Sequence, residues 1–203
     1  MKKIVFRTVK VWPRGMMHML ELLELKHHGR LHSGLDDCWT LVAVIRKLIE
    51  MELVEVHVVP GDVTHLICTH AHLDHIGNCN LFPHAAMMLA DEWAKPPSLY
   101  REIPWQKNGD GYGTYQLSSH ICILQTPGHT NHDISVVVSD STKPEGTVVV
   151  AGDIFECETD RARPDLWQSN STDVKQQEKS RDYLLKMAHW IVPGHGQMFH
   201  VSA

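Results

Sequence analysis

The residues best suited to chemistry are three histidines and an aspartate that fall within six positions, in the run Thr69-His70-Ala71-His72-Leu73-Asp74-His75. Imidazole and carboxylate groups at this density are typical of a metal-binding cluster. The preceding run Val63–Cys68 is short, apolar and β-branched and follows Pro60-Gly61-Asp62, so it predicts a buried strand entered from a turn. A His-rich surface loop is the alternative, and the carboxylate embedded among the imidazoles favours the cluster.

The spacing of these residues divides them into two pairs. Side chains two apart on an extended chain point to the same face, so His70 and His72 are expected to bind one metal ion together. Asp74 and His75 follow where the chain turns into a predicted helix, His75–Leu81, and they therefore point elsewhere. This arrangement suits a second ion.

Three further side chains occupy the same kind of position, where an apolar strand ends and a turn begins. They are His129 in Thr126-Pro127-Gly128-His129-Thr130, Asp153 in Gly152-Asp153, and His195 in Pro193-Gly194-His195-Gly196. Each of them alone is also explained as an ordinary polar turn residue. Together with the first cluster they predict convergence, because strand ends at one edge of a layered α/β fold hold their loops rigidly around a site.

The elements that must position these residues follow from hydrophobic periodicity. The predicted strands are Lys3–Trp12, Val54–Val59, Val63–Cys68, Ala85–Leu89, Ile121–Leu124, Ile134–Val138, Thr147–Ala151 and Ile191–Val192. An amphipathic helix is predicted over Thr40–Leu53, and a second one runs to about His189 from a cap at Ser171, Thr172 or Asp173, with Leu184, Leu185 and Ala188 facing inward. The Pro- and Gly-rich stretch Lys95–Gly113 is predicted to be a long loop, either a substrate-facing lid or an irregular connection.

Composition narrows the class of protein. A chain of 203 residues with a net charge of -5 fits one mildly acidic domain, 1–203, and its charge gives no independent sign of nucleic-acid binding. No apolar run reaches the roughly 20 residues of a membrane helix, and no signal-peptide pattern opens the chain. The five cysteines are scattered without zinc-finger spacing, so reduced core residues of an intracellular protein are expected.

The run His-x-His-x-Asp-His at 70–75, followed in order by His129, Asp153 and His195, resembles the metallo-β-lactamase superfamily. Within it, the stretch from Pro60 to Val201 is similar to a relative of the glyoxalase II group. The resemblance implies a four-layer αβ/βα sandwich of the α/β class. It also implies that His70, His72 and His129 bind a first metal, that Asp74, His75 and His195 bind a second, and that Asp153 bridges the two.

The N-terminal part departs from the family pattern. The family has a longer N-terminal β-region that ends in an Asp-Thr-Gly turn before the first helix, whereas Leu35-Asp36-Asp37-Cys38-Trp39 stands in that place without Thr-Gly. Residues 1–37 are therefore expected to form an irregular or incomplete part, with a shortened N-terminal β-region.

The ligand types indicate the chemistry. Imidazole and carboxylate groups at open sites suit two zinc ions, with iron or manganese as alternatives. Two cations about 3.5–4 Å apart share a hydroxide, lower its pKa and clamp the attacking and leaving oxygens, so hydrolysis with this hydroxide as the nucleophile is expected. Asp74 is the candidate catalytic residue that also orients or shuttles the proton. His132 is a weaker candidate for contact with the leaving group, and an exposed turn histidine is the alternative.

For the substrate, the resemblance implies an endoribonuclease that cuts single-stranded histone pre-mRNA near its 3′ end, in the nucleus or cytosol, as a homodimer and without a membrane. No Lys/Arg stripe with interleaved aromatic residues supports this independently. One alternative is a glyoxalase II-like thioesterase. That enzyme carries a helical domain after the last ligand, whereas this sequence ends eight residues after His195, which argues against the alternative. A non-catalytic metal-binding protein is the other alternative.

Overall fold

The computed structural model describes residues 60–96 and 98–201 of the chain. Contacts between residues divide the chain into two compact units: Met1–Thr64 with Asn78–His84, and His65–Gly77 with Ala85–Ala203. The single domain over 1–203 stays a prediction. The predictions that concern the N-terminal strand, the helix Thr40–Leu53, the strand Val54–Val59 and the shortened β-region lie outside the described residues.

In the first unit the structure describes two short 3-10 helices, Pro60–Asp62 and Cys79–Leu81.

The prediction of one helix over His75–Leu81 is wrong, because the structure has two separate helices there. Helix α3 spans only Leu73–Ile76, and Gly77 caps it by donating its backbone N–H to the carbonyl of Leu73. The 3-10 helix Cys79–Leu81 is therefore a separate element. Asp74 and His75 belong to α3, which begins two residues earlier than the predicted helix.

The first sheet of the second unit has four strands in the order β1-β2-β3-β4. These are β1 (His65–Cys68), β2 (Ala86–Leu89), β3 (Glu92–Lys95) and β4 (Leu99–Glu102). The first two strands pair in parallel and the others antiparallel. The strands predicted before His70 and over Ala85–Leu89 are confirmed, although only Cys68 of the first is buried. The long loop predicted over Lys95–Gly113 is wrong, because β4 and β5 lie inside it.

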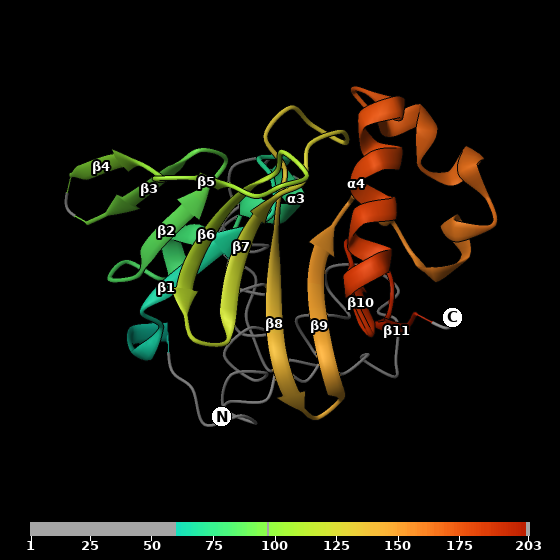
Figure 1. The fold of residues 1–203 in the computed structure, drawn as a ribbon. Coiled ribbons are helices and arrows are strands. Elements are labelled where there is room, and N and C mark those ends of the chain that lie inside the picture. Colours follow the sequence, from blue (N-terminus) through green and yellow to red (C-terminus); the bar gives the residue numbers. More distant parts are fainter. Residues whose placement is uncertain (1–59, 97, 202–203) are drawn as a thin grey trace, which may run out of the picture. The chain divides into compact units, whose positions relative to one another are not determined.

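The second sheet has seven strands in the order β11-β10-β9-β8-β7-β6-β5 (Figure 1). They are β5 (Gln106–Lys107), β6 (Gly113–Ser118), β7 (Ile121–Gln125), β8 (Ile134–Thr142), β9 (Glu145–Gly152), β10 (Trp190–Pro193) and β11 (Phe199–His200). All pairs are antiparallel except β9 with β10, which is parallel. The four strands predicted between Ile121 and Val192 are confirmed with small differences at their ends.

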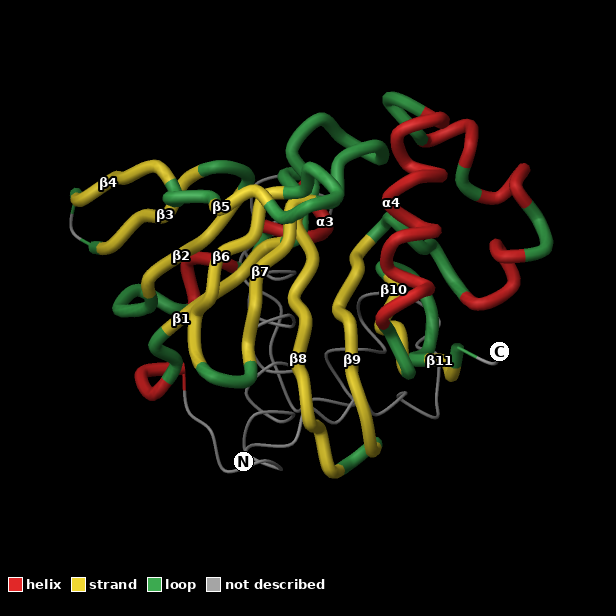
Figure 2. Tube along the Cα trace, in the orientation of Figure 1, coloured by secondary structure: helices red, strands yellow, loops and turns green. Residues whose placement is uncertain are grey.

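Apolar side chains on both faces of the second sheet explain the layering of this unit. On one face, Ile123 and Ile134 pack with Met88 of the first sheet. On the other, Val149 and Ile191 pack with Leu184 of helix α4 (Val174–Met187), which lies alongside β9 and β10 in Figures 1 and 2. The described residues thus supply three layers, sheet, sheet and helix, of the four-layer sandwich that the sequence resemblance implies. A sheet covered on both faces needs the continuous apolar runs that the sequence has there.

Helix α4 begins where Asp173 accepts a hydrogen bond from the backbone N–H of Gln176 at 3.0 Å, which confirms one of the three predicted caps. Between β9 and α4 the chain forms three 3-10 helices, Glu158–Arg161, Pro164–Leu166 and Gln168–Asn170. None of the helices in the described part of the chain has the length and apolar character needed to cross a membrane. The four described cysteines form no disulfide, and Cys38 lies outside the described residues.

Candidate metal centre

The strands deliver the predicted site residues to one place. His70 and His72 follow β1, and His129 lies in the turn between β7 and β8. Asp153 and His195 follow the parallel neighbours β9 and β10, whose carboxyl ends lie at the same edge of the sheet. All seven residues that the sequence analysis singled out as ligands therefore come together, from both sheets and from α3.

The first group consists of His70, His72, His129 and Asp153. Nδ1 of His72 lies 3.0 Å from Nε2 of His70 and 3.0 Å from Nε2 of His129. Oδ2 of Asp153 lies 3.6 Å from the same nitrogen of His70 and 3.4 Å from that of His129. Three ring nitrogens and a carboxylate oxygen therefore surround one point.

The second group shares the carboxylate of Asp153. Nε2 of His75 lies 3.6 Å from Oδ2 of Asp74 and 3.2 Å from Oδ1 of Asp153. Nε2 of His195 lies 3.6 Å from the same oxygen of Asp74 and 3.3 Å from Oδ2 of Asp153. Because Oδ2 of Asp153 belongs to both sets of contacts, this carboxylate joins the two groups.

These spacings fit metal coordination. Ligand atoms about 2.0–2.1 Å from a tetrahedral zinc ion lie about 3.3 Å from one another, close to the 3.0–3.6 Å measured within each group. In addition, Nε2 of His75 and Oδ1 of Asp153 are buried and, although they lie 3.2 Å apart, form no hydrogen bond with each other or with another described group. Buried polar atoms are normally paired, so atoms left open toward a common point indicate a bound ion. The His/Asp cluster thus suggests a dinuclear metal site.

Burial is the main cause of the lowered pKa of two imidazoles of the cluster. It lowers the pKa of His70 to about 4, against the opposing charge of Asp153 and with help from the neighbouring imidazoles. It also lowers the pKa of His129. Both rings are therefore neutral near pH 7, which is the form that coordinates metals. For Asp74, burial acts against ionisation, but a backbone hydrogen bond and the imidazoles of His75 and His195 outweigh it and lower the pKa.

The turn that carries His129 is tied to the start of α4. The backbone N–H groups of Thr172 and Asp173 donate to the carbonyls of His129 and Gly128 at 3.0 and 2.9 Å. Gly128 has a φ of +144°, and a Cβ at this position would lie 2.3 Å from the backbone of Gln177. The glycine before His129 is therefore required by the close approach of the turn to the helix.

The loop after β9 is held by the same helix. Gln177 donates from Nε2 to the carbonyl of Asp153 at 3.0 Å, and Arg181 donates to the carbonyl of Ile154 at 2.7 Å. Gly194 of the neighbouring loop packs against Asp153 so closely that a Cβ would lie 1.8 Å from its Oδ1. Gln177 thus holds the backbone of Asp153, and Gly194 packs against its carboxylate.

Sequence reasoning missed Glu156, which forms a third candidate group with Asp153 and His195. Its Oε2 lies 3.9 Å from Nε2 of His195. Burial and the charge of Asp153 raise its pKa. The only sign of Glu156 in the sequence is that an acidic residue stands three positions after Gly152-Asp153. Such a residue reaches the site only if the chain turns after Asp153.

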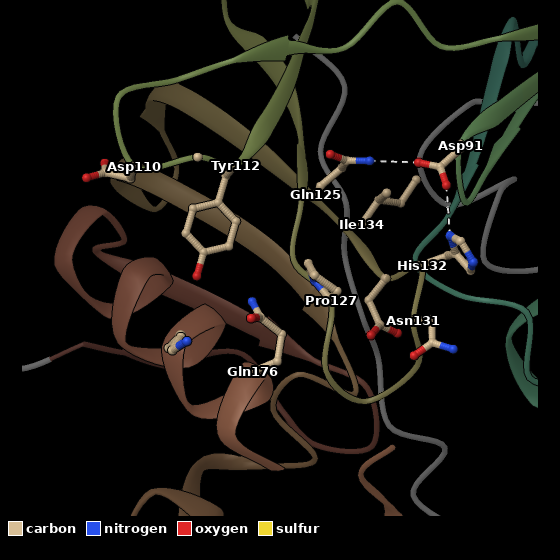
Figure 3. A pocket seen from close by; sticks show the side chains of 12 residues that line it. Asp91, Asp110, Tyr112, Gln125, Pro127, Asn131, His132, Ile134 and Gln176 are labelled. Carbon is tan, nitrogen blue, oxygen red and sulfur yellow. Dashed lines mark hydrogen bonds and ion pairs between the residues drawn. The ribbon is translucent and has the colours of Figure 1, made fainter. Parts of the chain in front are cut away.

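His132 does not join the cluster in the described structure. Its Nδ1 lies 2.7 Å from Oδ2 of Asp91, whose other oxygen accepts a hydrogen bond from Gln125 at 2.7 Å (Figure 3). These residues, with Tyr112 and Pro127, line a cavity of about 520 Å³ beside the His129 turn. The prediction that His132 contacts a leaving group is not tested by this arrangement.

Comparisons with known proteins agree with the site. The Lactamase_B family, described as the Metallo-beta-lactamase superfamily, matches residues 40–195. The chain is 44% identical over 149 residues to Metallo-beta-lactamase domain-containing protein 1 of Xenopus laevis, covering 71% of this chain and 58% of that protein. It is 44% identical over 191 residues to the protein of the same name in Homo sapiens, covering 93% and 66%.

The chain thus spans about three fifths to two thirds of the length of these curated relatives. Among solved structures, AidC, a dizinc quorum-quenching lactonase, superposes with a TM-score of 0.55 at 19% identity, covering 76% of this chain and 65% of that one. At this identity the likeness concerns the fold alone. The matched region, the identities to the relatives and the fold lead to one conclusion: this chain belongs to the metallo-beta-lactamase superfamily.

Proposed function

We propose that the protein is a metal-dependent hydrolase whose seven clustered side chains hold two divalent cations. His70, His72 and His129 would hold the first, His195 with Asp74 and His75 the second, and Asp153 would bridge them. The observation that carries the proposal is the position of Oδ2 of Asp153, within 3.3–3.6 Å of ring nitrogens from both groups. Zinc is the metal we expect, with iron or manganese as alternatives for the same donor set.

When bound, two such cations supply an activated water as nucleophile and stabilise the negative charge that develops in hydrolysis. The residues of the chain provide the geometry. The buried imidazoles and Asp153 form a fixed floor, because Thr69 contacts Nδ1 of His70 at 3.2 Å and α4 holds the loops. Asp74 is 60% exposed, so its carboxylate lies on the solvent side, where it can orient and accept a proton.

As the substrate we propose single-stranded RNA, specifically the 3′ region of histone pre-mRNA, cleaved by a homodimer in the cytosol and nucleus. Support comes from the sequence resemblance and from the exposure of the second ligand group. Asp74 is 60% and His195 47% exposed, which leaves one side of the cluster accessible to an extended chain. Two divalent cations also meet the charge of a phosphodiester locally, so a net charge of -5 is compatible with this substrate.

A glyoxalase II-like thioesterase uses the same kind of dinuclear site and is the second candidate. A metal-binding protein without turnover is the third. Substrate assays separate the three candidates, because the first would break a phosphodiester bond, the second a thioester bond and the third neither.

The experiment compares hydrolysis of a single-stranded RNA and of a generic thioester by the zinc-loaded protein at two salt concentrations. Three proteins are assayed: wild type, His70→Ala and the matched control His120→Ala, which removes a 61% exposed histidine at the opposite end of β7. RNA cleavage should exceed thioester hydrolysis and fall as salt rises, because phosphate contacts dominate the binding of single strands. It should be lost in His70→Ala and kept in His120→Ala.

Two results contradict the RNA proposal. Thioester turnover that His70→Ala abolishes, beside RNA cleavage that it leaves unchanged, identifies the nuclease as a contaminant and the thioesterase as the correct function. Two bound ions without turnover of either substrate favour the non-catalytic alternative.

A further inference from the structure

Glu156 lies at the edge of the second ligand group, and no role follows for it from the seven-residue cluster. We infer that its carboxylate is an additional donor to the second metal ion, so that this site holds three carboxylate groups beside two imidazoles. The inference rests on the proposed dinuclear site and adds a ligand to it. It begins from the grouping of Glu156 with Asp153 and His195, whose ligand atoms all lie within 4.8 Å of one another.

The backbone brings Glu156 to this position. After β9 the chain turns, with the N–H of Phe155 donating to the carbonyl of Gly152 at 3.1 Å. The carbonyls of Phe155 and Glu156 then accept the N–H groups of Gly194 and His195, each at 2.9 Å. These bonds continue the pairing of the loops beyond β9 and β10, so Glu156 and His195 are neighbours because of the fold itself.

Glu156 is also anchored on its other side. Its backbone N–H donates to Oδ2 of the buried Asp160 at 2.6 Å, and Asp160 is paired with Arg181 of α4. Its Oε1 lies 3.5 Å from Nδ2 of Asn170, which leaves Oε2 as the oxygen nearest to His195. A ligating carboxylate commonly has its second oxygen held by a hydrogen bond of this kind.

The distance between the side chains of Glu156 and His195 decides whether their donor atoms can bind the same ion. At 3.9 Å, Oε2 is farther from Nε2 of His195 than the 3.3–3.6 Å that separate this nitrogen from Asp153 and Asp74. Two donors that are each about 2.0–2.2 Å from one ion lie at most about 4.4 Å apart. At 3.9 Å, the oxygen of Glu156 and the nitrogen of His195 are therefore close enough to share one ion, and Glu156 would be a further donor to the second site.

The chemical consequence is a difference between the two sites. The first has three imidazoles and the shared carboxylate, a set that suits zinc. The second gains a carboxylate, and oxygen-rich sites suit harder ions such as Mn²⁺. Glu156 thereby raises the affinity of the second site for manganese without contacting the first.

The test measures metal binding and needs no substrate. Wild type, Glu156→Gln and Glu156→Asp are prepared metal-free, loaded with one equivalent of zinc, and titrated with Mn²⁺ followed by electron paramagnetic resonance. The matched control is Glu158→Gln, since Glu158 is an exposed carboxylate two positions away in the 3-10 helix Glu158–Arg161. Circular dichroism checks that each variant is folded.

Both Glu156 variants should bind Mn²⁺ at the second site about 10- to 100-fold more weakly than wild type, the scale of losses for groups that support a metal site. The zinc content of the first site should be unchanged, and Glu158→Gln should match wild type. Folded Glu156 variants with wild-type Mn²⁺ affinity overturn the inference and leave the proposed function standing. A wild type that binds only one ion contradicts the dinuclear function itself, so the two failures are distinguishable.

Discussion

Replacing Asp160 with asparagine removes the charge from a buried ion pair that supports the loop of Asp153 and Glu156. Oδ1 and Oδ2 of Asp160 accept hydrogen bonds from Nη2 and Nη1 of Arg181 at 2.6 and 3.1 Å. The exposed fractions of the two side chains are 0% and 8%. The guanidinium of Arg181 also lies over the rings of Phe155 and Trp167, at 4.1 and 4.7 Å from their centroids.

The expected loss follows from this burial. Removing one partner of a buried ion pair leaves an uncompensated charge and costs about 3–5 kcal/mol of unfolding free energy. Asparagine keeps the shape of the side chain, but it presents an amide donor where the carboxylate accepted bonds from Arg181 and from the N–H of Glu156. With a urea dependence of about 2 kcal/mol per M, the unfolding midpoint should fall by roughly 1.5–2.5 M.

The chain contains a matched control in the pair Arg163–Asp165. Its hydrogen bonds, at 2.9 and 2.6 Å, are as short as those of the buried pair, but the two side chains are 61% and 60% exposed. Solvent screens such a pair. Urea unfolding of the metal-free protein, followed by tryptophan fluorescence, should therefore place the midpoint of Asp165→Asn at that of wild type.

Both substitutions remove the charge of an aspartate that accepts two hydrogen bonds from an arginine, so the comparison separates a buried pair from an exposed one. If Asp160→Asn shifts the midpoint no more than Asp165→Asn does, the argument that burial makes the Arg181 pair structurally important is refuted. A change in the urea dependence itself would indicate a changed unfolding transition and would be analysed separately from the midpoint.

Three further results are expected. Gly128→Ala should cost about 1–3 kcal/mol in urea unfolding, because the new Cβ would lie 2.3 Å from the backbone of Gln177; wild-type stability would show that the close approach is not required. Asp153→Ala should lower the occupancy of both metal sites, whereas His72→Ala should mainly empty the first, as measured by metal analysis after dialysis; full metal content and activity in Asp153→Ala would disprove the bridge. Burial raises the pKa of Asp133 to about 6, so the folded metal-free protein binds a proton that the unfolded chain releases between about pH 4 and 6. Its contribution to stability then falls by about 3 kcal/mol as the pH rises through that window. Asp133→Asn should remove this pH dependence from urea unfolding, and an unchanged profile would exclude Asp133 as its cause.

Four strands of the second sheet, β7 to β10, were predictable because apolar layers pack on both faces of the sheet there, whereas β5, β6 and β11 were not predicted. Ile121–Gln125 and Ile134–Thr142 have the β-branched runs that a sheet covered on two sides requires. Strand β4 (Leu99–Glu102) was missed because all four of its residues are exposed and it is held by pairing with β3. Such pairing depends on a partner strand rather than on local composition, and the nearby prolines and glycines suggested a loop.

The site was predictable to the extent that its residues lie in turns at strand ends. His70, His129 and His195 follow apolar strands directly, so their convergence follows from the layered fold. Glu156 and Arg181 were missed for a different reason. Glu156 is placed by the hydrogen bond between its carbonyl and the N–H of His195, and Arg181 of α4 is placed by its hydrogen bonds to Ile154 and Asp160 in the loop after β9. The partners in these bonds are more than twenty residues apart in the sequence, and spacing along the chain carries no sign of them.

The division of the ligands between the two sheets also affects thermodynamic stability. His70 and His72 extend from β1 of the first sheet, whereas His129 and Asp153 extend from the second. An ion held by all four would add a crosslink to the apolar contacts, such as Met88 with Ile123, and the hydrogen bonds, such as Ile134 N–H to the Thr69 carbonyl, between the two sheets. By mass action, free metal at 100 times its dissociation constant adds about 2.7 kcal/mol to the folded state. The melting temperature should therefore rise with the buffered concentration of free zinc, and a chelator should lower the melting temperature of the wild-type protein.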